Sequence, residues 1–302
     1  MALTLTLLAS CAPTDNTKIT VGVMNGPTGM GMAKLMSDSG SDSELYAFET
    51  YSDPTVGVAD LTSGKLNMLC LPTNTAATLA TKKSDLLSVI AINTLGSLYL
   101  VTDEKNAVAS FEELDGKTIY TSVAGSTTKP IVEYLLKKNN ISANIVVEKD
   151  HDTLIAKVKS GGAPIAVLPE PKVTAGFMGS ADYKVRLNLS TEWSKVSDTA
   201  LTMGCIVVRN DFLADHKGAV DRFLNDYKAS VDFIADEKNL EESASLIVSA
   251  GILPKLPVAK GALNNLKGSI VFIEGEEMEL ALREFYKAIN QEVPNDGFFY
   301  EK

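Results

Sequence analysis

The chain has few of the residues that build metal and redox sites. Its 302 residues include two histidines and three cysteines, with no C-x-x-C or H-x-x-x-H spacing among them. This pattern argues against a zinc or haem site, and we expect no metal. Cys70 and Cys205 each stand in an apolar run, which is typical of inert buried thiols, while a disulfide between them stays open.

Basic residues are also in deficit. Lys and Arg total 28 against 38 Asp and Glu, which gives a net charge of -10. Such a chain repels phosphate backbones and anionic lipid headgroups, so nucleic acid is not expected as a partner. The composition, with 45% hydrophobic and 22% charged residues, is that of an ordinary soluble globular protein.

The apolar stretch at the start of the chain is too short to span a bilayer. Residues 1–10 are apolar and small, and Cys11 and a polar segment follow. The run fits the apolar end of a secretory signal, and Leu8-Ala9-Ser10-Cys11 resembles a bacterial lipobox. We expect residues 1–17 to be a signal remnant, lipobox and tether, with Cys11 lipidated and the protein anchored outside the cytoplasm. The alternative is a frayed terminus that contains a cysteine.

The rest of the chain alternates between apolar runs and helical spacing. Four times a short run is followed by a polar break and a helix, which predicts strand-loop-helix units and largely parallel sheets. The runs are 19–24, 68–71, 118–122 and 165–168. At about 150 residues per domain, the length suits two domains. We predict two α/β lobes: a discontinuous first lobe of residues 18–103 and 200–302, and an inserted second lobe of residues 104–199.

Longer segments predict the remaining architecture. Residues 87–101 are rich enough in β-formers for strands that leave one lobe, and 200–208 is a further strand. Residues 211–235 place apolar side chains on one helical face, and 239–250 and 276–290 behave similarly.

The glycine-rich stretch after the first predicted strand, Gly26-Pro27-Thr28-Gly29-Met30-Gly31, does not match a nucleotide-binding loop. It lacks the Lys and hydroxyl residue that a P-loop places after its last glycine, and its glycine spacing reverses the Rossmann order. No cofactor is expected. Bare backbone at a strand-to-helix junction still lets a ligand approach amides closely, so we interpret the stretch as one side of a ligand site, in which Gly29→Val should weaken binding and spare the fold.

Several segments, taken together, resemble type II periplasmic-type solute-binding proteins of the branch that serves sulfonate, nitrate and thiamine-precursor ABC importers. The segments are 62–80, 110–136 (which includes "FEELDGK"), 154–171 (which ends in "LPEP") and 207–234, and the likeness runs from about residue 18 to 289. The resemblance depends on the order and spacing of these segments. The chain departs from the family at Gly64–Asn67, at Gly161–Ile165 and at His216-Lys217.

The resemblance implies two lobes joined by two crossing strands, each lobe a mixed, mostly parallel sheet flanked by helices. Such a protein closes on a small molecule and delivers it to an ABC permease. We expect a monomer that is not an enzyme. A two-lobed enzyme of the same fold is the alternative of another class, and a sensory or adhesive module is a third.

Most of the predicted ligand residues lie in loops directly after predicted strands. In a parallel sheet such loops meet at the carboxyl edge, where ligands bind. For the hydroxyl and amide residues, helix capping is the competing interpretation. They are Asn25, Thr28, Gly29, Thr73, Asn74, Gly96 and Ser97 in the first lobe, and Ser126, Thr127, Thr128, Glu170 and Trp193 in the second.

The expected ligand follows from what these loops offer. The four arginines all lie outside them, which disfavours amino acids, because a forked guanidinium is the usual carboxylate clamp. Glu170 can accept from a ring N–H, and Trp193, Tyr51, Tyr99 or Tyr183 can stack on a flat ring. We therefore favour a small neutral or heteroaromatic nutrient, such as a thiamine precursor. A sulfonate held by helix N-termini is the alternative.

Overall fold

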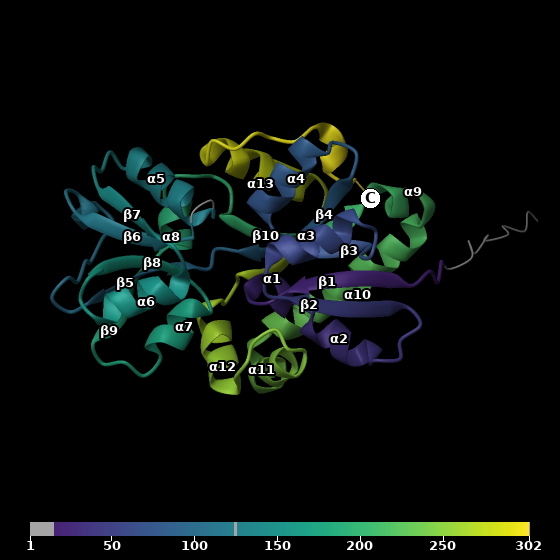
Figure 1. The fold of residues 1–302 in the computed structure, drawn as a ribbon, viewed down its shortest axis with the longest axis horizontal. Coiled ribbons are helices and arrows are strands. Elements are labelled where there is room, and N and C mark those ends of the chain that lie inside the picture. Colours follow the sequence, from purple (N-terminus) through teal and green to yellow (C-terminus); the bar gives the residue numbers. More distant parts are fainter. Residues whose placement is uncertain (1–14, 124–125, 302) are drawn as a thin grey trace, which may run out of the picture.

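The computed structural model describes residues 15–123 and 126–301, and these contain two separate β-sheets (Figure 1). The predicted lipidation site, Cys11, lies outside the described residues. Each sheet is flanked by helices, so the α/β class and the division into two lobes are confirmed.

The first sheet has six strands, and its order shows that the chain enters it twice. Parallel pairs join β3 to β1 and β1 to β2, whereas β10 and β4 run antiparallel to their neighbours. In spatial order the strands are β11 Ile270–Ile273, β4 Leu87–Leu95, β10 Thr202–Arg209, β3 Met68–Pro72, β1 Ile19–Met24 and β2 Tyr46–Tyr51.

The second sheet has five strands and the same mixture of directions. Its β7, β6 and β8 are parallel, and β5 runs antiparallel to both β8 and β9. In spatial order the strands are β7 Asn144–Glu148, β6 Thr118–Ser122, β8 Ile165–Pro169, β5 Leu98–Asp103 and β9 Tyr183–Asn188. Both sheets are mixed, as predicted, with a larger antiparallel share than expected.

The chain crosses between the sheets at two adjacent places. One crossing is Gly96-Ser97, between β4 and β5, and the other leads into β10; the Gly96 amide donates to the Leu201 carbonyl at 2.7 Å. Gly96 has φ of 63°, and a Cβ there would lie 2.0 Å from Ser190 Oγ. Because β5 pairs within the second sheet, residue 103 is too late for the first boundary; we propose that the second lobe begins at this crossing and ends near residue 199.

The helices cover the sheets. In Figure 1, α4 and α13 lie above the first sheet and α2 and α10 below it. The helices of the first lobe are α1 Pro27–Met30, α2 Ala33–Ser39, α3 Pro54–Thr62, α4 Thr73–Lys82, α9 Asn210–Asp215, α10 Lys217–Ala235, α11 Leu240–Ser249, α12 Leu256–Asn265 and α13 Gly275–Ala288. Those of the second are α5 Thr128–Lys138, α6 His151–Lys159, α7 Lys172–Phe177 and α8 Leu189–Ser194. Short 3₁₀ turns occupy Glu112–Leu114, Glu237–Asn239 and Asp296–Phe298.

The predicted elements are recovered with one break. The long helix expected over 211–235 is divided at His216, whose φ of -134° and ψ of 42° are not helical. The apolar face continues through α10 all the same, with Val220, Phe223 and Leu224 buried. That face packs into the core of the first lobe, as the periodicity predicted.

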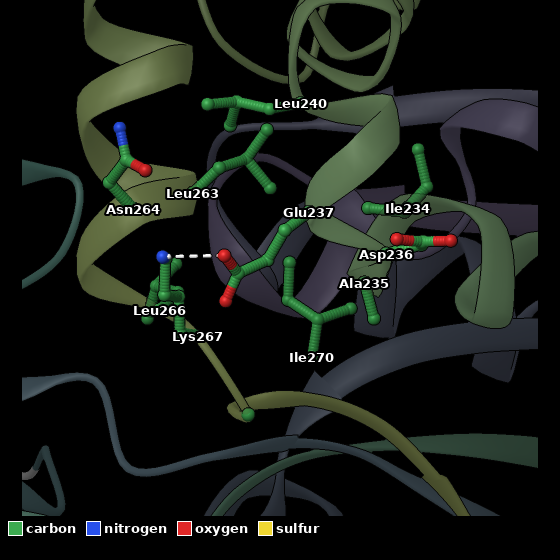
Figure 2. Close-up of a pocket in the computed structure, with 11 residues that line it drawn as sticks. Ile234, Ala235, Asp236, Glu237, Leu240, Leu263, Asn264, Leu266, Lys267 and Ile270 are labelled. Atoms are coloured by element: carbon green, nitrogen blue, oxygen red, sulfur yellow. Dashed lines mark hydrogen bonds and ion pairs between the residues drawn. The ribbon is translucent and has the colours of Figure 1, made fainter.

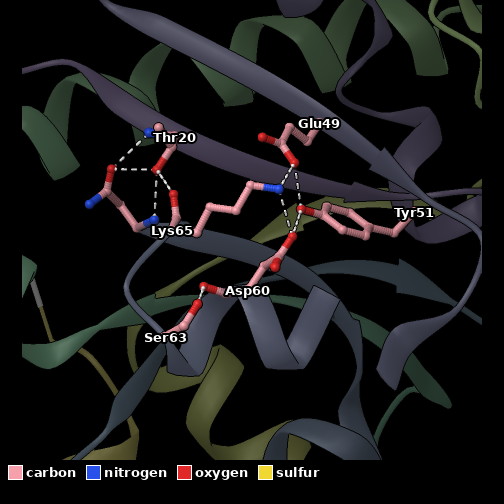
Figure 3. A network of polar contacts seen from close by, with 7 residues as sticks. Thr20, Glu49, Tyr51, Asp60, Ser63 and Lys65 are labelled. Atoms are coloured by element: carbon pink, nitrogen blue, oxygen red, sulfur yellow. Dashed lines mark hydrogen bonds and ion pairs between the residues drawn. The ribbon is translucent and has the colours of Figure 1, made fainter. Parts of the chain in front are cut away.

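A polar network secures the outer edge of the first sheet (Figure 3). Lys65 Nζ contacts Glu49 Oε2 at 2.7 Å and Asp60 Oδ2 at 2.9 Å, and the Tyr51 hydroxyl donates to both carboxylates. The hydrogen bond from Lys65 is the main reason that the pKa of each carboxyl is lowered. The network ties β2 to α3 and lies on the surface, where salt screens it.

Gly29 is required by the packing of α1, which corrects the expectation that a larger residue would leave the fold intact. A Cβ at Gly29 would lie 2.0 Å from the Met24 carbonyl oxygen, and backbone cannot move aside as a flexible side chain can. We predict that Gly29→Val lowers the free energy of unfolding by about 3 kcal/mol, measured by urea denaturation.

Gly297→Val is the matched control, because Gly297 is exposed and a Cβ there would meet only the Asn295 side chain, at 3.5 Å. Unchanged stability of Gly29→Val would contradict the packing argument.

Candidate functional site

The loops that follow the parallel strands meet in one cleft between the lobes. The cleft has a volume of about 390 Å³, within the range of small-molecule sites. Its residues come from both lobes and from the crossing between them. They are Asn25, Pro27, Thr28, Pro54, Pro72, Asn74, Thr75, Thr94, Ser97, Leu98, Val123, Ser126, Thr127, Thr128, His151, Pro169, Glu170 and Met203.

Most of the predicted ligand residues line this cleft. They are Asn25, Thr28, Asn74, Ser97, Ser126, Thr127, Thr128 and Glu170. The others, Gly29, Thr73, Gly96 and Trp193, are placed elsewhere. Gly29 and Gly96 have structural roles in the α1 turn and the crossing, and Thr73 is fully buried, with its hydroxyl directed to the Thr202 carbonyl at 3.3 Å.

No tryptophan, tyrosine or phenylalanine is among the described residues that line the cleft. Trp193 is buried, donates Nε1–H to the Thr199 carbonyl at 2.8 Å, and packs against Tyr134 and Phe285. Tyr51, Tyr99 and Tyr183 direct their hydroxyls to other protein groups. The predicted aromatic stacking surface is therefore absent from the described part of the cleft.

One helix of each lobe starts at the cleft, and the N-cap residue of neither makes a side-chain cap. Helix α4 begins after Pro72 in the first lobe and α5 begins after Thr127 in the second, and neither N-cap residue accepts a hydrogen bond from the helix through its side chain. The N-cap residues are Pro72 and Thr127, so Thr73, Asn74 and Ser126, for which capping was the alternative, lie next to the N-cap positions. Free amides at a helix start offer hydrogen bonds and partial positive charge.

Glu170 is buried and bridges the two lobes. Its side chain accepts from Asn265 Nδ2 of α12 at 2.6 Å, and from the Thr174 amide and hydroxyl of α7 at 3.2 and 3.1 Å. Burial raises the pKa of the Glu170 carboxyl, against the donors that lower it. These donors occupy much of the accepting capacity of the Glu170 carboxylate, and its contact with a ring N–H of the ligand stays a prediction.

His151, which was not among the predicted ligand residues, also lines the cleft. It is the first residue of α6, and its Nδ1 lies 2.6 Å from the buried Ser122 hydroxyl, at the end of β6. Burial and the charge of Lys172 lower the pKa of the imidazole, so at neutral pH the ring is uncharged. One signal in the sequence pointed to this position: Asp150 is a typical N-cap residue, so it predicts a helix that starts at His151.

Among the described residues that line the cleft there is no lysine, arginine or aspartate. Lys129, at the start of α5, pairs with Glu133 at 3.0 Å and is half exposed. Within residues 15–123 and 126–301 no cluster of three His, Cys, Asp or Glu residues could hold a metal.

The two internal cysteines do not pair. Cys70 and Cys205 are free and buried on adjacent antiparallel strands. Cys70 is opposite Ile206 and Cys205 is opposite Leu71, so successive positions direct the two thiols to different faces of the sheet.

A second pocket, between the end of α10 and α12, is too small to be a solute site. Its volume is about 70 Å³, and the ion pair between Lys267 and Glu237, at 2.8 Å, lies beside it (Figure 2). Its lining includes Ile234, Leu263 and Ile270, which belong to the core. The cleft between the lobes is the better candidate. In the described part of the chain, no helix is both long and apolar enough to cross a membrane.

Comparison with known proteins identifies the fold and the family. The chain resembles an ABC transporter structure from Parabacteroides distasonis (18% identity, 95% of this chain and 99% of that chain, TM-score 0.77). It also resembles the periplasmic aliphatic sulphonate binding protein SsuA of Escherichia coli (12% identity, 94% and 92%, TM-score 0.71). A third similar structure is the periplasmic nitrate-binding protein NrtA of Synechocystis (12% identity, 90% and 80%, TM-score 0.64).

These likenesses confirm the two-lobed periplasmic binding protein fold. No curated protein matches the sequence significantly. The family model described as NMT1/THI5 like matches residues 47–239, which is more than half of the chain. The chain therefore belongs to the NMT1/THI5-like family.

Proposed function

We propose that the protein is the extracytoplasmic solute-binding component of an ABC importer. Its family, its fold and a cleft lined from both lobes support this function. The protein would capture a small solute between the lobes and deliver it to a permease, as a monomer held to the membrane through lipid on Cys11. A tether of this kind keeps a scavenging protein close to its transporter.

The chemistry of the cleft favours binding over catalysis. A Ser–His pair is present, but the Ser122 side chain is 2% exposed and does not line the cleft, so its hydroxyl is not presented to a solute as a nucleophile must be. Glu170 is occupied by Asn265 and Thr174. The cleft thus offers donors and acceptors and no activated nucleophile.

For the ligand we propose a small, oxygen-rich anion of the sulfonate class, the alternative in the sequence analysis. The observation that carries this choice is the pair of uncapped helix starts, α4 and α5, on opposite sides of the cleft. Hydroxyls of Thr75, Ser126 and Thr128 lie beside them. Helix amides bind acceptor oxygens well.

A neutral or heteroaromatic nutrient is the second candidate ligand. Its support now comes from apolar residues of the cleft and not from the predicted aromatic side chains. Four prolines with Leu98 and Met203 give the cleft apolar contacts, and His151 is itself a flat ring. A thiamine-precursor-like solute could pack against these groups, although the aromatic side chains first considered for that role lie elsewhere.

The lobes are held together on one side of the cleft by Glu170, Asn265 and Thr174. Besides Glu170, Asn265 Nδ2 also contacts Thr174 Oγ1 at 3.2 Å, and the Tyr99 hydroxyl donates to the Asn265 carbonyl. These contacts join α12 of the first lobe to α7 and β5 of the second. They stabilise the closed arrangement, so they lower the free energy that the solute must supply to keep the lobes closed.

A thermal-shift panel tests the ligand class. We expect alkanesulfonates to raise the melting temperature and pyrimidines to leave it unchanged, because only the former place several acceptor oxygens at the helix starts. A ligand at 100 times its Kd adds about 2.7 kcal/mol to stability, which the assay detects. Stabilisation by pyrimidines with no response to sulfonates would reject the sulfonate class and support the second candidate.

Replacing Asn265 tests the inter-lobe contact. We predict that Asn265→Ala destabilises the closed form by about 1–3 kcal/mol, because the buried Glu170 carboxyl loses its closest donor. Solute affinity should fall, and small-angle X-ray scattering should report a larger radius of gyration without solute. Asn264→Ala is the matched control, since Asn264 is the exposed neighbour on α12. Equal behaviour of the two variants would remove Asn265 from the closing mechanism.

A further inference from the structure

The imidazole of His151 is held in one orientation at the edge of the cleft. Its Nδ1 is turned toward Ser122 at 2.6 Å, and Ser122 is buried at the end of β6. Since His151 also lines the cleft, the ring edge left to face a solute is the one that carries Nε2. A side chain fixed in this way binds without losing much conformational freedom.

The hydrogen-bonding of Ser122 favours one tautomer. Among the described residues, the Ser122 hydroxyl has one hydrogen-bond partner, His151 Nδ1. A buried O–H group without an acceptor is costly, so the hydroxyl donates to Nδ1. The ring proton then lies on Nε2, and His151 offers an N–H donor to the cleft.

The charged groups around the ring are engaged with one another. On its own helix, Asp150 caps the Thr153 amide at 2.6 Å, and Asp152 pairs with Lys172 of α7 at 2.7 Å. In the same lobe, directly after β8, Glu170 is bonded to Asn265 and Thr174. Because these neighbours already have partners, a solute anion is the unpaired charge that the ring would meet.

We propose that His151, fixed by Ser122, is the specificity-determining residue of the cleft: it donates Nε2–H to an oxygen of an anionic solute and becomes a cation toward that anion in mild acid. The inference rests on the proposed function and extends it, by naming the side chain that separates a charged solute from a neutral one of the same shape.

The sign of the pH dependence follows from linkage. In the free protein, burial and Lys172 hold the pKa of His151 below its ordinary value, and a bound anion raises that pKa because it stabilises the charged ring. Charging the ring also puts a proton on Nδ1, so the Ser122 hydroxyl must turn from donor to acceptor, which opposes protonation in the free protein. A bound anion offsets that cost, so protonation and anion binding favour each other. Affinity for an anion should rise as the pH falls, whereas affinity for a neutral solute should not rise.

The test compares ethanesulfonate with ethyl methyl sulfone, which has sulfonyl oxygens but no charge, by isothermal titration calorimetry at pH 7.5 and 5.5. We expect the wild-type protein to bind ethanesulfonate several-fold more tightly at the lower pH, because one unit of pKa shift on binding sets an upper limit of about tenfold. The sulfone should show no such gain.

Two substitutions at position 151 separate the roles of the ring. His151→Asn keeps a polar atom toward Ser122 but has none at Nε2, so it should lose about tenfold in affinity at pH 7.5. His151→Gln restores an N–H donor that does not titrate, so it should recover affinity without the gain in acid. Any gain left in His151→Gln reports Glu170, whose carboxyl also titrates in the cleft.

His216→Gln is the matched control. The second histidine contacts Thr17 and Asp15, outside the cleft, and its replacement should keep both the affinity and the pH dependence of the wild-type protein. Circular dichroism and melting curves establish that all variants are folded.

The outcomes are distinct. If ethanesulfonate binds, and both His151 variants retain the wild-type affinity and pH dependence, the role of His151 is wrong and the proposed ligand class stands. If the folded wild-type protein binds ethanesulfonate at neither pH, the ligand class fails and the inference fails with it. If it binds the sulfone as tightly as ethanesulfonate at both pH values, selection for charge is overturned.

Discussion

The whole arrangement depends on the place where the chain crosses twice between the sheets. The Gly96 amide bonds to the Leu201 carbonyl, so the outgoing and returning segments lie side by side and fix the spacing of the lobes. Gly96 and Ser97 both have positive φ, which turns β5 into the second sheet. Close by, Glu170 N donates to the Ser97 carbonyl at 2.9 Å, so the loop that carries the inter-lobe contact is attached to the same crossing.

With the crossing fixed, the direction of the strands decides what faces the cleft. β1, β3, β6 and β8 end there, and the helices that follow begin there, so small polar residues and amides accumulate from both lobes. In the tightly packed α1 turn, too, the path of the backbone decides which residue faces the cleft. Gly29 is needed where the chain bends back on Met24, while its neighbour Thr28 reaches the cleft.

Much of this could be predicted from sequence, because strand-loop-helix order leaves a strong local pattern. The strands at 19–24, 68–72, 118–122 and 165–169 were expected almost as observed, and most of the predicted polar residues of their loops line the cleft. The pairing of β5 with β8 and β9 was missed, because a run of β-formers does not reveal which sheet it joins.

Contacts between distant segments could not be predicted either, because a local sequence pattern does not show which segments meet in the fold. Asn265 reaches Glu170 from a helix at the far end of the sequence, and no periodicity signals that meeting. His151 was not predicted as a ligand residue, because it starts a helix whose position relative to the cleft depends on β6 and β7. Trp193 was expected at the ligand because large aromatics suit flat solutes, but its ring is used to fill the space between helices.

The position of that ring has a spectroscopic consequence. Trp193 belongs to α8 of the second lobe, and its ring centroid is 5.8 Å from that of Phe285 on α13 of the first. It is also the only tryptophan in the chain. Any rotation of the lobes changes the surroundings of a single indole, so the intrinsic fluorescence of the unmodified protein reports opening and closing without a label.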